Sequence, residues 1–498
     1  MKHISKKILA LLLAVLLIIS LAACGSSASS DSEDTGSAPE QTESGPSSGD
    51  SSENTERAEA DDFPGAPPEG GPGGTPPEKP EGNSAPGGPG GSSADIEYSG
   101  AEEITSADLQ SDQHYSSTTA DESALLISTA DEVTVTNPSV TKTGDSDGGD
   151  NCNFYGLNAA VLVKGGSTTT ITGGTITSDA DGANGVFSYG GNGGKNGASG
   201  DGTTVIIRDT KIVTTGDGSG GIMTTGGGIT YAYDLDVTTS GRSSAAIRTD
   251  RGGGTVVADG GSYTSNGLGS PAIYSTADVT VSNASLTSNL SEGVCIEGLN
   301  SITLISCDLT ANNTKRNGNA TFLDTIMIYQ SMSGDADSGT SHFTMTGGSL
   351  TSKSGHVFHV TNTNAVITLE DVDIINEDAD NILLSVCADG WSGGSNIAAV
   401  KAISQKLSGA IKVGSDSSLT LELTEGSSFE GCIDGSISNA SGETVSAETG
   451  AVTVTLDSMS TWTLTGDSYV TEFSGNPANV NTNGYTLYVN GVALTDAV

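Results

Sequence analysis

Basic residues are scarce in this chain: 19 Lys and Arg stand against 61 Asp and Glu, for a formal net charge of −42. A nucleic-acid-binding protein needs a basic face that neutralises phosphates, so the composition excludes nucleic acid as a partner. Aromatic residues make up only 4%, whereas Gly, Thr, Ser and Asp, which are poor helix formers, are abundant. The composition therefore disfavours a helical bundle.

Long apolar runs are also missing, apart from one at the N-terminus. Residues 1–23 combine Lys2, Lys6 and Lys7 with an apolar run that is short for a membrane span, as in a signal peptide. The run ends in Leu-Ala-Ala-Cys24-Gly, which resembles the lipobox of bacterial lipoproteins. We expect cleavage before Cys24 and a lipid on that cysteine, which would anchor the chain to the outer face of the cell membrane without spanning it.

The chain contains only five other cysteines, and they include no Cys-x-x-Cys pair. A zinc ribbon or a thioredoxin-like site is therefore excluded. Five cysteines cannot all pair, and we expect them to be mostly buried, small apolar residues. They are Cys152, Cys295, Cys307, Cys387 and Cys432.

Residues 24–97 contain almost no aromatic or branched apolar side chains, and eleven of the 14 prolines lie there. Such a segment buries too little surface to offset its ordering entropy. We expect an acidic, disordered Gly/Ser/Pro tether that lifts the following domain away from the membrane.

From residue 98 onward, short apolar runs separated by Gly, Asn and Asp recur with a period near 24 residues. A period in the low twenties with two or three short strands indicates a stacked solenoid, whose turns need Gly, Asn and Asp for positive φ. Three longer spacings indicate insertions, the clearest at 189–202 and 311–340. The central apolar residues are Val140, Ile176, Ile212, Val237, Tyr263, Leu286, Leu309, Leu350 and Ile374.

These repeats resemble right-handed parallel β-helix proteins of the pectate-lyase-like superfamily. The stretches at 153–159, 243–254, 269–278 and 460–469 are more narrowly similar to tethered, adhesin-like surface lipoproteins of Gram-positive bacteria. The resemblance implies an all-β solenoid over residues 98–498, with an N-terminal cap at 98–135 and C-terminal coils or a cap at 450–498. It does not imply one activity, because β-helices host lyases, hydrolases, binding modules and adhesins.

An acidic, glycine-rich loop places Asp145, Asp147 and Asp150 close together. Hard oxygen ligands of this kind suit calcium, although the spacing is not that of an EF-hand. The alternative is a set of solvated turn aspartates. We expect no metal site from histidine, because His356 and His359 are three residues apart in a strand and should lie on opposite faces.

Two arginines beside an aromatic residue are unusual in so acidic a chain. Arg248 and Asp250 share a strand face, Arg251 follows, Tyr274 lies one coil later, and Glu297 lies near the same ridge. Arginine forks bind carboxylates and sugar hydroxyls, and tyrosine faces stack on pyranose rings. The alternatives are an ion pair that stabilises the ridge, or a catalytic group like the Arg or Lys base of polysaccharide lyases in the superfamily that the chain resembles.

We therefore expect a monomeric, lipid-anchored recognition protein at the cell surface or in the wall, binding carbohydrate as an adhesin or capture protein. No residue is assigned a catalytic role and no cofactor is required. A polysaccharide lyase or hydrolase is the first alternative, and a structural wall spacer without a specific ligand is the second.

Overall fold

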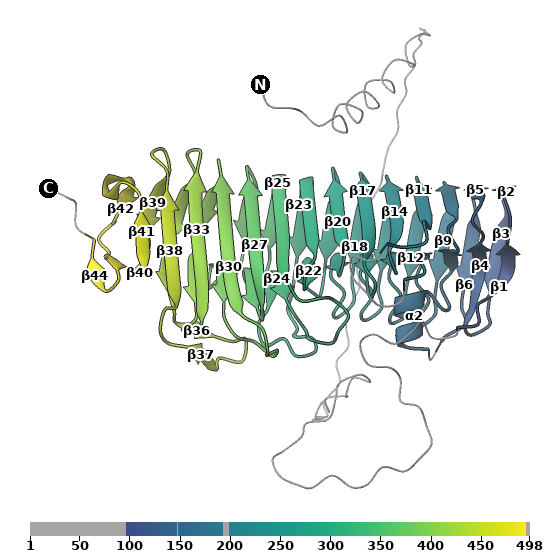
Figure 1. Ribbon diagram of the computed structural model, residues 1–498, viewed down its shortest axis with the longest axis horizontal. Coiled ribbons are helices and arrows are strands. Elements are labelled where there is room, and N and C mark those ends of the chain that lie inside the picture. Colours follow the sequence, from purple (N-terminus) through teal and green to yellow (C-terminus); the bar gives the residue numbers. More distant parts are fainter. Residues whose placement is uncertain (1–95, 147, 193–198, 495–498) are drawn as a thin grey trace, which may run out of the picture. The chain divides into compact units, whose positions relative to one another are not determined.

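The computed structural model describes residues 96–146, 148–192 and 199–494, and it is built almost wholly of strands. Successive coils of the chain place parallel strands beside one another (Figure 1). The expected fold class, an all-β right-handed parallel β-helix, is confirmed. The predicted signal peptide, the lipidated Cys24 and the tether up to residue 95 lie outside the described residues.

Each coil contributes strands to three parallel ribbons. Ribbon 1 is a 13-stranded sheet. Its strands are β1 (Ser99–Ile104), β4 (Glu122–Ser128), β7 (Val161–Lys164), β10 (Val186–Tyr189), β13 (Ile222–Thr225), β16 (Ile247–Thr249), β19 (Ile273–Ser275), β22 (Val294–Glu297), β24 (Asp324–Tyr329), β26 (His356–Thr361), β29 (Ile382–Val386), β32 (Ala410–Val413) and β35 (Ile433–Asp434).

Ribbon 2 runs beside ribbon 1 and shares two long strands with ribbon 3. Its strands are β2 (Asp108–Ser111), β5 (Glu132–Thr136), β8 (Thr168–Thr172), β11 (Thr204–Arg208), β14 (Gly228–Tyr233), β17 (Gly254–Asp259), β20 (Asp278–Ser282), the first parts of β23 (Ser301–Ala311) and β25 (Thr340–Ser352), β27 (Thr363–Glu370), β30 (Asn396–Ile403), β33 (Ser417–Thr424), β38 (Ala451–Leu456) and β41 (Glu472–Ser474).

Ribbon 3 closes each coil and continues, near the C-terminal end, as a separate 4-stranded sheet. Its strands are β3 (His114–Ser117), β6 (Ser139–Lys142), β9 (Thr175–Ser178), β12 (Lys211–Thr214), β15 (Asp236–Thr239), β18 (Ser262–Ser265), β21 (Ser285–Ser288), the second parts of β23 and β25, β28 (Asp373–Asn376), and then β31 (Lys406–Ser408), β34 (Ser428–Gly431), β39 (Thr461–Leu464) and β42 (Val480–Asn481).

The apolar column predicted for ribbon 3 forms without a break. Each of the nine residues, from Val140 to Ile374, is paired in direct register with its equivalent on a neighbouring coil. Eight of them are buried and Ile374 packs against the same core. Because side chains alternate along each strand, one in-register apolar residue per coil is enough to build a continuous hydrophobic wall.

The turn between ribbons 2 and 3 recurs in a left-handed conformation. Asn137 and Asn283 adopt φ values of 52° and 54° there, and their side-chain amides donate to Asp112 and Asp259 of the preceding coil at 2.7 Å. Asn and Asp tolerate this conformation and bond their neighbours locally, which explains why they punctuate the repeat.

Insertions gather along one side of the coil stack (Figure 1). They include α2 (Asp150–Tyr155), the hairpin of β36 (Ile437–Ser438) and β37 (Thr444–Ser446), and the long connections that precede and follow β24. Three small hydrophobic clusters separate from the main core lie beneath them, against the outer side of ribbon 1. Inserted chain therefore covers those parts of the outer side of ribbon 1 that contact these clusters.

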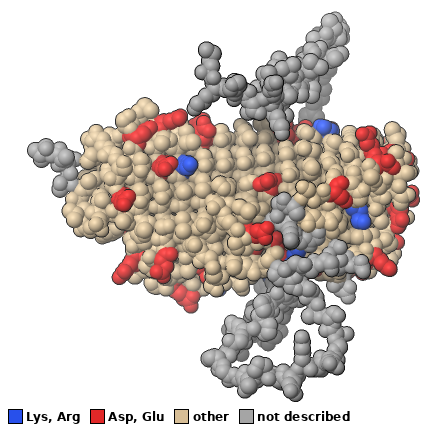
Figure 2. All heavy atoms as spheres, viewed as in Figure 1, with Lys and Arg blue, Asp and Glu red and all other residues tan. Residues whose placement is uncertain are grey.

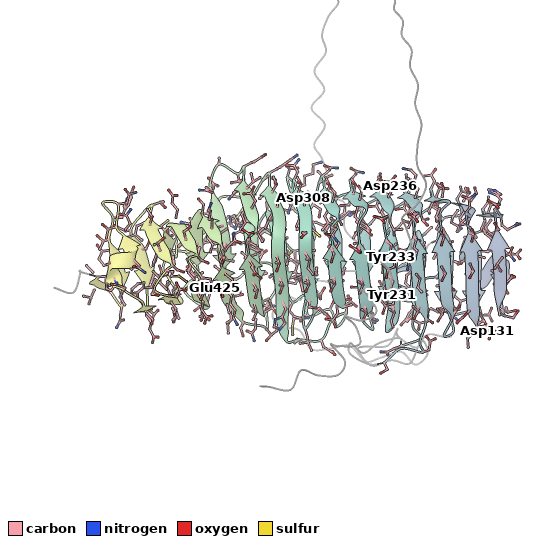
Figure 3. All side chains as sticks on the ribbon, turned by 90° about the horizontal axis from the view of Figure 1, so that it is seen from above. Asp131, Tyr231, Tyr233, Asp236, Asp308 and Glu425 are labelled. Atoms are coloured by element: carbon pink, nitrogen blue, oxygen red, sulfur yellow. The ribbon has the colours of Figure 1, made fainter. Side chains whose placement is uncertain are left out.

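The opposite ribbons keep an exposed strand face. Tyr231 and Tyr233 lie on the outer side of β14 (Figure 3), where the Arg208 guanidinium stacks 3.8 Å from the ring centre of Tyr233. Acidic side chains are scattered over the face shown in Figure 2, with few basic ones between them. This distribution reflects the excess of acidic residues in the sequence, and the face shown has no basic patch.

The first and last stretches of the domain differ in build. Residues 98–135 form β1 to β5, which pair in parallel with the coils that follow. The C-terminal stretch ends in a small sheet of β40 (Ser468–Val470), β43 (Leu487–Val489) and β44 (Val492–Ala493), beside the short helix η1 (Pro477–Asn479). Inside the last coils, the buried Trp462 stacks on Phe429 with ring centres 5.6 Å apart.

Candidate functional site

The arginine group predicted from the sequence is brought together on ribbon 1. Arg248 pairs in register with Tyr274 of the next strand, as expected from the repeat. An Arg248 Nη atom lies 3.0 Å from an Asp250 carboxylate oxygen. The Tyr274 hydroxyl donates to Glu297 at 2.6 Å, and the Tyr329 hydroxyl donates to the same carboxylate at 3.1 Å.

Inserted chain covers this group. Arg248 also donates to Asn153 of α2 at 3.0 Å, and Arg251 donates to Asp335 of the insertion after β24 at 2.6 Å. The Arg248 and Asp250 side chains are only 12% and 5% exposed. Burial raises the pKa of Asp250 to about 7, and the positive charge of Arg248 limits the rise. The ligand-binding role of these residues stays a prediction, and their burial favours a bridge between insertions.

Asp145 of the predicted calcium loop bonds the backbone of a neighbouring coil, and calcium binding by the loop stays a prediction. The Asp145 carboxylate accepts from the Asp181 backbone N–H at 3.0 Å, and Asp181 accepts in turn from Asp217 at 2.7 Å. Asp150 begins α2, and Asp147 lies outside the described residues. Among residues 96–146, 148–192 and 199–494, no group of three or more His, Cys, Asp or Glu is placed to hold a metal ion.

The expectation that His356 and His359 face opposite sides is wrong. Both Nδ1 atoms lie 2.7 Å from the hydroxyl oxygen of Ser385. The strand breaks its alternation here, because Val357 and Phe358 both enter the core and leave the two imidazoles on the outer side. A period-2 argument cannot detect such a bend.

His359 lies within a buried polar network that joins two insertions. Its Nε2 lies 3.4 Å from an Asp389 carboxylate oxygen, and the Phe322 ring stacks on its imidazole at 4.6 Å. Burial opposes ionisation of Asp389, but His359 and the hydrogen bonds from Thr321 hold the pKa of its carboxyl below the usual value. Since Phe322 and Asp389 come from different insertions, this network clamps both onto ribbon 1.

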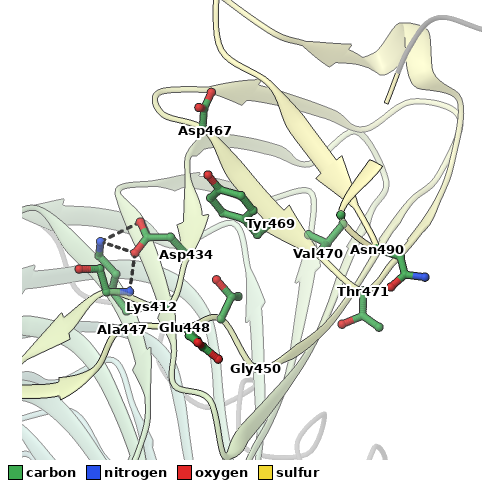
Figure 4. A pocket seen from close by; sticks show the side chains of 14 residues that line it. Lys412, Asp434, Ala447, Glu448, Gly450, Asp467, Tyr469, Val470, Thr471 and Asn490 are labelled. Atoms are coloured by element: carbon green, nitrogen blue, oxygen red, sulfur yellow. Dashed lines mark hydrogen bonds and ion pairs between the residues drawn. The ribbon is translucent and has the colours of Figure 1, made fainter. Parts of the chain in front are cut away.

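An open groove near the C-terminal end is the candidate binding site, and reasoning from the sequence missed it. It has a volume of about 650 Å³ and is lined by residues of β32, β35, β40 and the turn after β43 (Figure 4). Its charged side chains, its one amide side chain and its one aromatic side chain come from segments far apart in the sequence. They are Lys412, Asp434, Glu448, Asp467, Tyr469 and Asn490.

Tyr469 presents a rigid aromatic surface to this C-terminal groove. Its side chain is 43% exposed, and its ring stacks on Tyr488 with centres 5.1 Å apart and planes 7° apart. The two tyrosines are in register on β40 and β43, so the stacking follows from strand pairing. A tyrosine held in this way loses little side-chain entropy when it binds a planar partner.

The charged groups of the C-terminal groove are mostly acidic. Lys412 contacts both carboxylate oxygens of Asp434, at 2.8 and 2.9 Å, and Asp434 also accepts from the Ser436 N–H. Asp467 accepts from the Thr486 N–H at 2.8 Å, and Glu448 adds a third carboxylate. Three carboxylates against one amine repel anions and offer acceptors to hydroxyl groups. The rarity of lysine is the one signal in the sequence that could have pointed to Lys412, and we did not single it out.

Four of the five described cysteines are buried and Cys432 is partly exposed, which confirms the expectation of mostly buried, small apolar residues. No helix among the described residues is long and apolar enough to cross a membrane.

Comparison with known proteins adds no relative: no family model, no curated protein and no solved structure matches the chain. Membership of the pectate-lyase-like superfamily, and the likeness to adhesin-like surface lipoproteins, therefore stay predictions from the sequence. What the structure supports is an all-β fold of stacked parallel strands.

Proposed function

We propose that this protein is a surface-anchored carbohydrate-binding protein and that the C-terminal groove binds its sugar chain. The observation that carries the proposal is Tyr469, an aromatic face fixed against Tyr488 and bordered by carboxylates and backbone amides. Carbohydrate sites combine an apolar face for the ring with polar groups for the hydroxyls. Cys24, if lipidated, would hold the protein on the outer face of the membrane, where such a ligand is met.

The charge of the C-terminal groove favours neutral sugars over uronic acids. Asp434 is neutralised by Lys412, while Glu448 and Asp467 lie in the same groove without a further lysine or arginine among its lining residues. A uronate would bring another negative charge toward these carboxylates, at a cost that grows at low salt. We therefore expect binding of neutral chains, with polygalacturonate bound weakly.

Lyase chemistry is not favoured in this groove. The only amine among its lining residues, the Lys412 Nζ, contacts both oxygens of Asp434, and an ammonium held in an ion pair is a poor proton acceptor. A lyase would release 4,5-unsaturated ends from polygalacturonate, which absorb in the ultraviolet. A rise in that absorbance on incubation with the purified protein would overturn the binding assignment.

A glycan array tests the proposal directly. Wild-type protein should bind a set of neutral polysaccharides, and a Tyr469→Ala variant should lose that binding. Failure of the wild type to retain any neutral or acidic glycan on the array would reject carbohydrate recognition.

A further inference from the structure

Two buried carboxylates lie on neighbouring coils of ribbon 1 with no basic side chain to neutralise them. Glu292 and Asp324 are 6% and 1% exposed, and neither takes part in any ion pair found among the described residues. The Gly293 N–H donates to the Thr325 carbonyl at 2.8 Å, so the backbones of the two acids run side by side. The imidazole nearest in register belongs to His356, paired with Asp324, and its Nδ1 lies 2.7 Å from the Ser385 hydroxyl oxygen.

A buried amide lies between these two acids. Asn313, 1% exposed, donates through Nδ2 to the Asp324 carbonyl at 3.1 Å, and its side chain also hydrogen-bonds to Glu292. The remaining oxygen of the amide, Oδ1, has no hydrogen-bond donor, and neither has Asp324 Oδ1. Two buried acceptor oxygens without donors are costly unless another positive group satisfies them.

A single proton shared by the two acids would leave one negative charge on the pair, and Asn313 Oδ1 has no donor among the described residues. A divalent cation would balance both carboxylates and supply the contact that the two free oxygens lack.

We propose that Glu292, Asp324 and Asn313 form a buried site for a hard divalent cation, and that calcium is its occupant. Carboxylate and amide oxygens in an irregular arrangement suit calcium better than magnesium, which demands near-octahedral geometry. Soft or borderline metals are disfavoured because the donors are all oxygen. The proposed site lies on neighbouring coils of ribbon 1.

The proposed cation would stabilise an insertion. Asn313 belongs to the connection between β23 and β24, whose Phe322 stacks on His359 and whose Thr321 donates to Asp389. Binding at Asn313 would hold the start of this connection to the strands that carry Glu292 and Asp324. The site lies apart from the C-terminal groove, so its test does not depend on sugar binding.

The test uses the mature protein, purified without chelator. We expect about one calcium per chain by elemental analysis. Removal of calcium by EDTA should lower the melting temperature by several degrees. Added calcium should restore the melting temperature, and an equal concentration of magnesium should not.

Matched variants locate the effect. A protein with both E292Q and D324N should lose the calcium-dependent shift in melting temperature. The control variant, with E102Q and E103Q on the exposed strand β1, removes the same number of charges and should keep the shift. If the buried double variant does not fold, D324N alone is tested. It should raise the calcium concentration that gives half of the shift in melting temperature by at least about tenfold. A wild-type protein without calcium and without a shift would overturn the proposal, as would a shift that the buried variants retain. Buried variants that are more stable than a calcium-insensitive wild type would show that the two acids share protons instead.

Discussion

Lys412 and Asp434 are paired on neighbouring strands of ribbon 1, with Nζ 2.8 and 2.9 Å from the two carboxylate oxygens. Their side chains are about one-fifth exposed, so water screens the pair less than it would a surface ion pair. The same outward column of ribbon 1 contains Arg248, Tyr274 and His359. Toward the C-terminal end, this column reaches the open groove at Lys412.

The aromatic wall of the C-terminal groove can be tested with two equally exposed tyrosines. Tyr469→Ala should reduce the affinity for a neutral oligosaccharide by about tenfold or more, because the stacking face is lost. Tyr485→Ala is the matched control, since Tyr485 is also 43% exposed but does not line the groove. Calorimetric titration of both variants measures the difference, and equal losses would remove the groove from consideration.

The acidic lining should set the selectivity between neutral and anionic sugars. Combining Glu448→Gln with Asp467→Asn should increase binding of oligogalacturonates at low salt, because two repelling charges are removed. The gain should shrink as ionic strength rises. Glu102→Gln with Glu103→Gln changes the total charge equally on β1, and a similar gain in that control would mean that selectivity comes from net charge.

Close stacking of glycines should make one turn intolerant of a side chain. A Cβ at Gly241 would clash with the Gly216 carbonyl oxygen of the preceding coil. Gly241→Ala should therefore destabilise the domain by about 1–3 kcal/mol or more, as overpacking does. The exposed neighbour Ser240 provides the control, since Ser240→Ala should leave the denaturation midpoint nearly unchanged.

Asp250 should make stability fall as pH rises. Its pKa is about 7 in the folded protein against an ordinary value of 3.8, so between these values the unfolded chain releases a proton that the folded chain retains. The contribution of Asp250 to the free energy of unfolding is therefore fully present below about pH 4. It is lost as the pH rises from there to about pH 7. Asp250→Asn should remove this part of the pH dependence in urea unfolding experiments between about pH 4.5 and 8. An unchanged profile would place the titrating group elsewhere.

The fold followed from local patterns that recur once per coil. The column from Val140 to Ile374 was predictable because in-register stacking requires only one apolar residue at each equivalent position. The juxtaposition of Arg248 with Tyr274 was predictable for the same reason. The side on which His356 and His359 point was not, because it depends on a strand bend that alternation does not encode.

By itself the sequence determined the solenoid, its register and its acidic character, since these depend on composition and on a repeat of about two dozen residues. Only the tertiary structure decided which charged groups are accessible. Insertions bury Arg248 and Asp250, while the C-terminal sheet leaves Tyr469 exposed beside Lys412 and Asp434. Insertions have no repeat, and where they pack depends on contacts between distant residues such as Arg251 with Asp335.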